Sequence, residues 1–92
     1  MDAKRLLDVK NWSQVEHGIL RYAIVAKVAY EIIIERWEVD KPLETAIASL
    51  CVVGYWHNPD GTSTLDREWL GKEKPISELL NVAEKDCIEN PF

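Results

Sequence analysis

Basic residues are few in this sequence compared with acidic ones. The 11 lysines and arginines stand against 16 aspartates and glutamates, so the formal net charge is −5 and the pI is about 4.9. Nucleic-acid backbones and anionic membrane surfaces both select proteins with basic patches. The composition therefore argues against a nucleic-acid polymer or a membrane as partner, although a few local donors suffice to hold a small anion.

Cysteine is also scarce, because only Cys51 and Cys87 are present and they do not form a C-x-x-C pair. Neither a zinc site nor a disulfide framework is indicated, and we expect both thiols to be reduced, unpaired and buried on apolar helical faces. The common catalytic motifs for hydrolases, metalloproteases and nucleotide-binding enzymes are missing. His17 and His57 share no metal-ligand spacing. We therefore expect no enzymatic activity, no catalytic or metal-binding residues and no cofactor.

No apolar run is long enough to cross a bilayer, which takes about 20 predominantly apolar residues. Lys27 and Glu31 interrupt the most hydrophobic segment. The first residue is followed directly by charged ones, so no secretory signal peptide is expected. These features predict a cytoplasmic protein.

The sequence does contain one long apolar stretch, residues 14–38, around which we expect the rest of the chain to be arranged. Its apolar side chains recur at three- and four-residue steps, which is typical of a helix. They include Val15, Ile19, Tyr22, Ala26, Ala29, Ile33 and Trp37. Ser13 and Glu16 match a capping box at the start, and Pro42 ends the helix. Glu31 and Glu35 are expected on its solvated edge.

Further apolar residues widen that face beyond what a helix resting on a single core needs. We therefore expect the helix to lie at the centre of the domain or in the interface of a homo-oligomer, most simply a two-fold dimer.

The whole chain, residues 1–92, is predicted to be a single all-α domain, a small bundle of four to five helices. A short helix capped by Asp2 precedes the central one, and others follow over residues 42–51, residues 65–70 and from Pro75 onward. The inner face of the last helix is expected to contain Ile76, Leu79, Leu80, Ala83 and Cys87. Residues 58–61, Asn-Pro-Asp-Gly, have the preferences of a type I turn.

Residues 55–69 contain more chemically active side chains than a turn requires. Aromatic rings, hydroxyl groups, amide groups and one arginine occur close together, and such a set suits a flat, anionic ligand such as a nucleotide derivative. The candidate ligand-binding residues are Tyr55, Trp56, His57, Asn58, Thr62, Thr64, Arg67 and Trp69. In the alternative interpretation, Trp56 and Trp69 attach a long loop to the core.

The order of these motifs resembles the small ryanodine-receptor-type (RyR) domain of bacteria and phages, over roughly residues 26–70. The family's A-x-x-x-H-E pattern is matched by residues 26–31, except that Tyr30 replaces the histidine. Its E-S-A-I, N-P-D and Trp-Leu motifs correspond to residues 44–47, 58–60 and 69–70. The connection between the first two helices is shorter here, and the family's later G-W-x-Y-G and His-Pro segments are absent.

The resemblance implies a non-catalytic module that binds nucleotide-derived signals. A free-standing version would sequester such a signal, as phage counter-defence proteins do. The second function left open is an acidic helical protein-interaction module, of inhibitor or immunity type, with no small ligand. The acidic composition favours this second function, and the aromatic, hydroxyl and arginine side chains of residues 55–69 favour the first.

Overall fold

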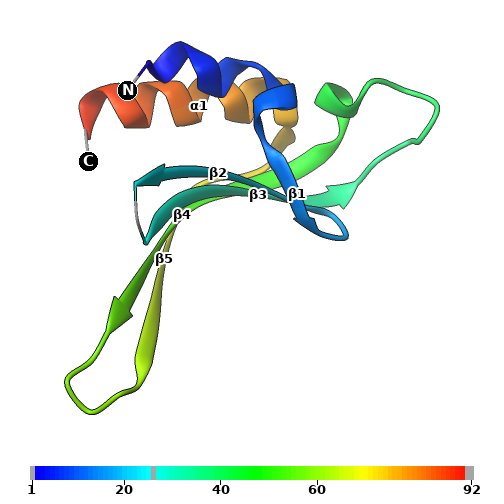
Figure 1. The fold of residues 1–92 in the computed structure, drawn as a ribbon. Coiled ribbons are helices and arrows are strands. Elements are labelled where there is room, and N and C mark those ends of the chain that lie inside the picture. Colours follow the sequence, from blue (N-terminus) through cyan, green and yellow to red (C-terminus); the bar gives the residue numbers. More distant parts are fainter. Residues whose placement is uncertain (1, 26, 91–92) are drawn as a thin grey trace.

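The computed structural model of the protein describes residues 2–25 and 27–90, and these form a two-layer arrangement of one sheet and one layer of helices (Figure 1). Five antiparallel strands pair in sequence order. They are β1 (Ser13–Glu16), β2 (Ile19–Val25), β3 (Val28–Arg36), β4 (Ile47–His57) and β5 (Ser63–Pro75). The α-helix α1 (Ile76–Glu89) follows β5, and three 3-10 helices lie earlier: η1 (Ala3–Leu7), η2 (Val9–Asn11) and η3 (Leu43–Thr45). The predicted all-α bundle is wrong.

The apolar stretch expected to be the central helix forms β1, β2 and β3 instead. Valine, isoleucine and tyrosine favour strands, and alternate residues of β3 point to opposite faces of the sheet. Tyr30 and Ile32 belong to the core beneath the helices, whereas Ala29 packs in a cluster on the other side. Because both faces of β3 are apolar, the strand has no clean period of two. Its sequence therefore resembles that of a helix that is apolar all round.

Two residues inside this stretch adopt left-handed backbone angles that a helix does not contain. Gly18 has φ of 77° in the β1–β2 turn, and Lys27 has φ of 74° between β2 and β3. Ser13 and Glu16 are the two ends of β1, so the expected capping box does not form.

Two further predicted helices are also strands. A helix was predicted over residues 42–51, but the structure has only the short 3-10 turn η3 there, followed by β4. The helix predicted over residues 65–70 is part of β5. The turn at residues 58–61 is confirmed, since the amide of Gly61 donates to the carbonyl of Asn58 at 3.1 Å. It closes the β4–β5 hairpin rather than linking two helices.

The predictions for the two ends of the chain fare better. Asp2 caps the first helix by accepting from the amide of Lys4 at 3.0 Å, although that helix is 3-10. The last helix is confirmed as α1, and its predicted inner face is buried: Ile76, Leu79, Leu80, Ala83 and Cys87.

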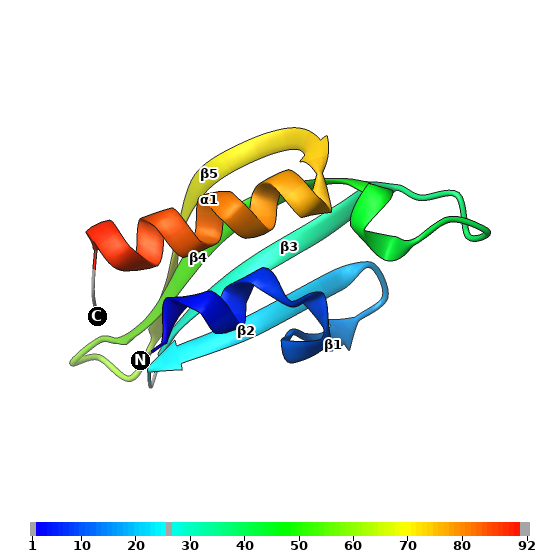
Figure 2. The ribbon, with the colours of Figure 1, turned by 90° about the horizontal axis from the view of Figure 1, so that it is seen from above.

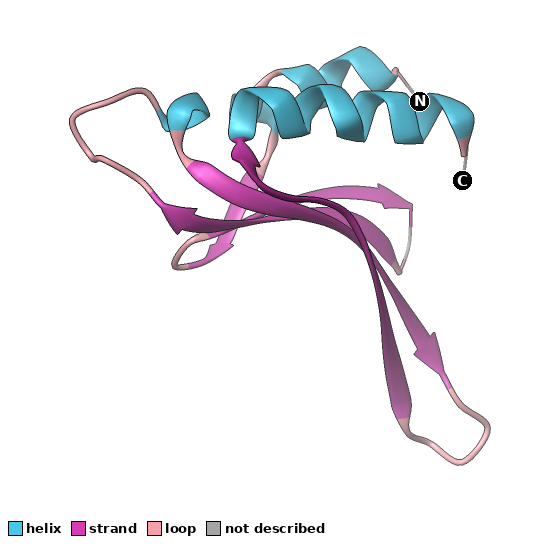
Figure 3. Ribbon diagram, turned by 180° about the vertical axis from the view of Figure 1, so that it is seen from behind, coloured by secondary structure: helices cyan, strands magenta, loops and turns pink. Residues whose placement is uncertain are grey.

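In residues 2–25 and 27–90, the helices cover one face of the sheet. Figures 1 and 3 show α1 and η1 side by side on that face. The main core lies between the layers, where Ile32 and Leu50 of the sheet cluster with Leu6 of η1 and Leu79 of α1. At Gly71 the backbone of β5 comes so close to α1 that a Cβ atom would lie 2.9 Å from Cδ2 of Leu79.

The β4–β5 hairpin is much longer than the rest of the sheet. Its far end projects away from the helix layer as a two-stranded arm, which makes the molecule elongated, 47 × 26 × 20 Å (Figures 1 and 3). Isolated two-stranded hairpins are only marginally stable in water, so the base of this arm depends on its contacts with β3.

Both cysteines are free and buried, as predicted. Cys87 lies on α1 as expected, but Cys51 lies on β4 rather than on a helix. Among residues 2–25 and 27–90, no helix is both long enough and apolar enough to cross a membrane.

Candidate functional site: the open face of the sheet

The face of the sheet turned away from α1 carries no helix within the described chain (Figure 3). We call it the open face and define it by one group of side chains: Arg21, Ala29, Glu31, Cys51, Val53, Tyr55, Arg67, Trp69 and Lys72. Strand register produces the group. Arg21, Glu31, Cys51 and Trp69 are successive partners across β2, β3, β4 and β5. Because directly opposed residues of antiparallel strands share a face, these four form one row across the sheet.

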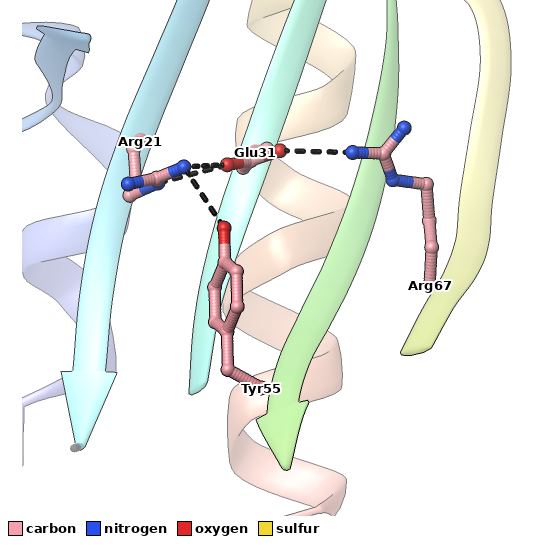
Figure 4. A network of polar contacts seen from close by, with 4 residues as sticks. All are labelled: Arg21, Glu31, Tyr55 and Arg67. Carbon is pink, nitrogen blue, oxygen red and sulfur yellow. Dashed lines mark hydrogen bonds and ion pairs between the residues drawn. The ribbon is translucent and has the colours of Figure 1, made fainter. Parts of the chain in front are cut away.

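The centre of the open face is buried although no helix covers it. Cys51 and Val53 are fully buried, and Ala29 is nearly so. Longer side chains stand around them, namely Arg21, Tyr55, Arg67 and Trp69. Figure 4 shows three of these four converging on Glu31, with α1 behind the sheet. The small residues in the middle are therefore shielded from water by side chains of the sheet itself.

Glu31 is the polar centre of the open face. Its side chain is 4% exposed and contacts two arginines that are each about one-third exposed. Arg21 donates to Oε2 from Nε at 2.8 Å and from Nη2 at 2.5 Å, and Arg67 donates to Oε1 from Nη2 at 3.4 Å (Figure 4). The hydrogen bond to Glu31 raises the pKa of Arg21. A buried carboxylate is costly unless it is paired, and here both of its oxygens are paired.

Two half-exposed aromatic rings stand beside these arginines. The hydroxyl of Tyr55 accepts from Nη2 of Arg21 at 3.2 Å, and the guanidinium carbon of Arg21 lies 6.0 Å from the centroid of that ring. Trp69 contacts two cations, since Arg67 Cζ lies 5.6 Å and Lys72 Nζ 5.3 Å from its ring centroid. Such cation–π contacts orient the charged groups and keep them near the apolar surface.

Three of the side chains that define the open face are positive and one, the buried Glu31, is negative, so this group has a net positive charge inside a protein of net charge −5. The donors not used on Glu31 stay available at the surface, because Arg21 and Arg67 are partly exposed. Chemically, this arrangement can hold an anion, and the aromatic rings beside it can contact an apolar or planar group.

The structure brings only part of the predicted ligand site together on this face. Tyr55, Arg67 and Trp69 lie on it. The backbone of Trp56 belongs to β4, but its side chain lies outside the part of the structure that is described. The remaining predicted residues lie at the tip of the arm: His57, Asn58, Thr62 and Thr64.

At the tip, the polar groups bond to one another. Nδ2 of Asn58 donates to Oγ1 of Thr62 at 3.0 Å and to Oγ1 of Thr64 at 2.9 Å. The Ser63 hydroxyl pairs with Nδ1 of His57 at 3.1 Å. Hydrogen bonds from Thr62 lower the pKa of Asp60. These contacts hold the turn at the tip together. They do not involve Trp56 or Trp69, the residues that the alternative interpretation expects to attach the loop to the core.

Of the four charged residues that define the open face, only Arg67 was predicted from the sequence as a binding residue. Glu31 was placed on a solvated helix edge, and Arg21 and Lys72 were given no role in a site. One signal was present, a single glutamate in the strongly apolar run of residues 28–34. In a strand, that glutamate shares a face with residues 29 and 33, so it needs a cationic partner on a neighbouring strand. Strand pairing decides that this partner is Arg21, directly opposite it.

The class of protein that this geometry defines is a small two-layer α+β domain with one uncovered, cationic and aromatic sheet face. Comparison with protein-family models, with curated proteins and with solved structures found no match for this chain. The RyR-type resemblance thus gains no support from relatives. The two helices on which its first motifs were placed are strands and one 3-10 turn.

Proposed function

We propose that the protein is a non-catalytic binding module whose open face binds an acidic segment of a protein partner. The observation that supports this most directly is the pairing of Arg21 and Arg67 on a buried Glu31. The carboxylate holds both guanidinium groups in place before any partner arrives, which lowers the entropy lost on binding. The proposal belongs to the protein-interaction class that the sequence left open. It differs from that hypothesis because the binding surface is cationic and the partner is acidic.

The shape of the face favours a macromolecular partner over a small one. Small ligands prefer concave sites that enclose most of their surface. The open face is instead the side of a sheet whose central residues are already covered by neighbouring side chains. Interfaces with proteins are enriched in arginine, tyrosine and tryptophan, which is the composition of this face.

The acidic-partner proposal is tested with two synthetic peptides of equal length, one alternating glutamate with tyrosine and the other lysine with tyrosine. We expect only the acidic peptide to shift the amide resonances of β2–β5, with an affinity that falls as salt rises. Lys72→Glu should weaken binding of the acidic peptide about tenfold or more. Lys85→Glu, an equal charge change on α1, is the matched control. Equal effects of the two variants, or equal binding of the two peptides, would overturn the proposal.

A nucleotide-derived ligand is the second candidate, and Arg67 beside Trp69 is the observation that favours it. An arginine next to an indole suits a phosphate joined to a planar base. The RyR-type resemblance implies the same ligand class and a sequestering role. A thermal-shift screen with linear and cyclic nucleotides tests this. Stabilisation that disappears in both Arg67→Ala and Trp69→Ala supports the second candidate, and no shift with any nucleotide removes it.

Self-association and a cytoplasmic location are proposals that accompany both candidates. The predicted interface helix does not exist, but Val25 and Leu65 remain about half exposed on the sheet. Light scattering should give at least a dimer mass at tens of micromolar, and Leu65→Asp should reduce it. A monomer mass at that concentration would exclude the homo-oligomer.

A further inference from the structure

A hollow in the surface lies at the other end of the molecule from the arm, where the helix layer stops. Figure 2, seen from above, shows the β1–β2 turn and η3 at the same end of the sheet, beyond the start of α1. A hollow of about 460 Å³ opens there. It is lined by Gln14, His17, Gly18, Ile19, Leu20, Ile34, Glu35, Trp37, Val39 and Leu43. Its volume lies in the range of roughly 300–1,000 Å³ that is usual for small-ligand sites.

The hollow is the open end of the main hydrophobic core. Leu20 is part of that core, and Ile34 and Leu43 pack against it. Neither α1 nor η1 contributes a lining residue, so Ile34 and Leu43 stay partly exposed at this end, above the buried Leu20. Trp37 and Val39, in the connection after β3, stand at the side and are 43% and 82% exposed. Covering this apolar floor and the exposed indole beside it with an apolar group would be favourable, because apolar surface would be removed from water.

The walls of the hollow are held in place by hydrogen bonds. The amide of Ile34 donates to the carbonyl of Gly18 at 2.8 Å, which fixes the β1–β2 turn against β3. Nε1 of Trp37 donates to the carbonyl of Lys41 at 3.1 Å, and this bond fixes the indole against the connection that follows β3. On the far side, the hydroxyl of Thr45 donates to the carbonyl of Pro42 at 2.7 Å and closes the turn of η3. The hollow is thus formed before a ligand enters.

The charge of the lining selects among apolar ligands. It includes the carboxylate residue Glu35 and, of the residues given above, none is a lysine or arginine. One oxygen of Glu35 accepts from the Ser49 hydroxyl at 3.3 Å. A cation is favoured near a carboxylate, and an indole face attracts a cation as well. An anionic ligand, which suits the open face, would be disfavoured here.

We infer that this hollow binds a compact apolar molecule that carries a single ammonium group. The apolar body would rest on the floor of Leu20, Ile34 and Leu43, and the ammonium group would lie toward Glu35 and Trp37. The site shares no residue with the group that defines the open face, and it does not depend on the function proposed for that face.

The inference is tested with three probes that share one ring and differ in charge: 2-phenylethylammonium, 2-phenylethanol and 3-phenylpropionate. Titration followed by amide resonances should rank the ammonium first and the carboxylate last, with at least tenfold between them. The largest shifts should fall on residues 17–20 and 34–43. Glu35→Gln keeps an acceptor for Ser49 and should bring the ammonium and the alcohol to similar affinities.

Two changes at Val39 make a matched charge reversal that does not threaten the fold, because this side chain is 82% exposed. Val39→Glu should strengthen binding of 2-phenylethylammonium and Val39→Lys should weaken it, each by several-fold. Arg67→Ala on the open face should leave it unchanged. Equal affinity for all three probes, no shift at residues 34–43, or insensitivity to the charge at position 39 would overturn the inference.

Discussion

Tyr30 of β3 and Asp86 of α1 are joined by a hydrogen bond of 2.6 Å from the phenol to Oδ2 of the carboxylate. The two residues are 56 positions apart in the sequence, and the bond ties the middle of the sheet to the last turns of the helix. Tyr30 is fully buried, so its hydroxyl needs a partner inside the protein, and Asp86 supplies it.

Removing this hydroxyl should destabilise the fold without altering its shape. We expect Tyr30→Phe to lower the free energy of unfolding by about 1.5–3 kcal/mol, the range for a hydrogen bond to a charged group. Urea denaturation measures it. Asp86→Ala should have a similar effect, and the double variant should cost clearly less than the sum of the two. Strict additivity would show that the bond does not couple the layers.

The same pair should produce a loss of stability in alkali. Burial and Asp86 together raise the pKa of Tyr30 in the folded protein. The unfolded chain therefore releases this proton first, from a phenol with a pKa of about 10. The contribution of Tyr30 to stability is complete below that pH and falls as the pH rises above it. The difference in unfolding free energy between wild type and Tyr30→Phe should shrink between pH 9 and about 11; a constant difference would contradict this.

The two arginines on Glu31 should contribute unequally. Arg21 makes two short hydrogen bonds to the carboxylate, and Arg67 makes a single one at 3.4 Å. Double-variant cycles with Glu31→Gln should give a larger coupling energy for Arg21→Ala than for Arg67→Ala. Partial exposure of both guanidinium groups limits each value to about 1–2 kcal/mol. A larger coupling for Arg67 would contradict the geometry of the open face.

The close approach of β5 to α1 should make Gly71 intolerant of a side chain. Its Cβ would meet the end of Leu79 at 2.9 Å, so Gly71→Ala should cost about 1–3 kcal/mol through overpacking. Thermal unfolding is the measurement. Leu79→Val shortens the obstructing side chain, and the double variant should recover part of the loss caused by Gly71→Ala. Gly71→Ala with wild-type stability would show that the Leu79 side chain can move aside at little cost.

The cysteines should both react slowly in the native state, and Cys51 should be the slower. Burial raises the pKa of Cys51 to about 11 and also raises the pKa of Cys87, so neither is a thiolate at neutral pH. Cys51 is fully buried, whereas Cys87 is 8% exposed near the end of α1. With a thiol reagent, Cys87 should react first, and the rate at Cys51 should follow global unfolding as denaturant is raised. Early labelling of Cys51 would show that the side chains over it open readily.

Local signals in the sequence were interpreted correctly where the contacts that decide them are also local. The cap at Asp2, the turn at residues 58–61 and the amphipathic face of α1 all depend on residues within a few positions of one another. The burial of both cysteines was also predicted, because burial follows from the apolar character of the neighbours whichever element contains them. For Cys51 the prediction was right although the helix assigned to it was wrong.

The central stretch shows why the rest failed. Its apolar residues satisfy a period of 3.6 only because they are so many that they fill every face. A strand with both faces apolar has the same composition, and length was the only remaining guide. That guide was lost because Gly18 and Lys27, which make the two turns, were taken as parts of a helix. The candidate site could not be predicted for the same reason, since strand register alone brings Arg21, Glu31 and Trp69 together.

The sequence by itself determined the local elements at both ends of the chain, the hairpin turn, the state of the cysteines and the amount of apolar surface to be buried. Only the tertiary structure decided that this surface forms a sheet with helices on one face, and that Glu31 lies between two arginines on the other. The physical reason is range. A cap or a turn is decided by the free energy of a few neighbouring residues, whereas strand pairing depends on contacts between residues 10 to 36 positions apart, as in the pairs of Glu31 with Arg21 and Arg67.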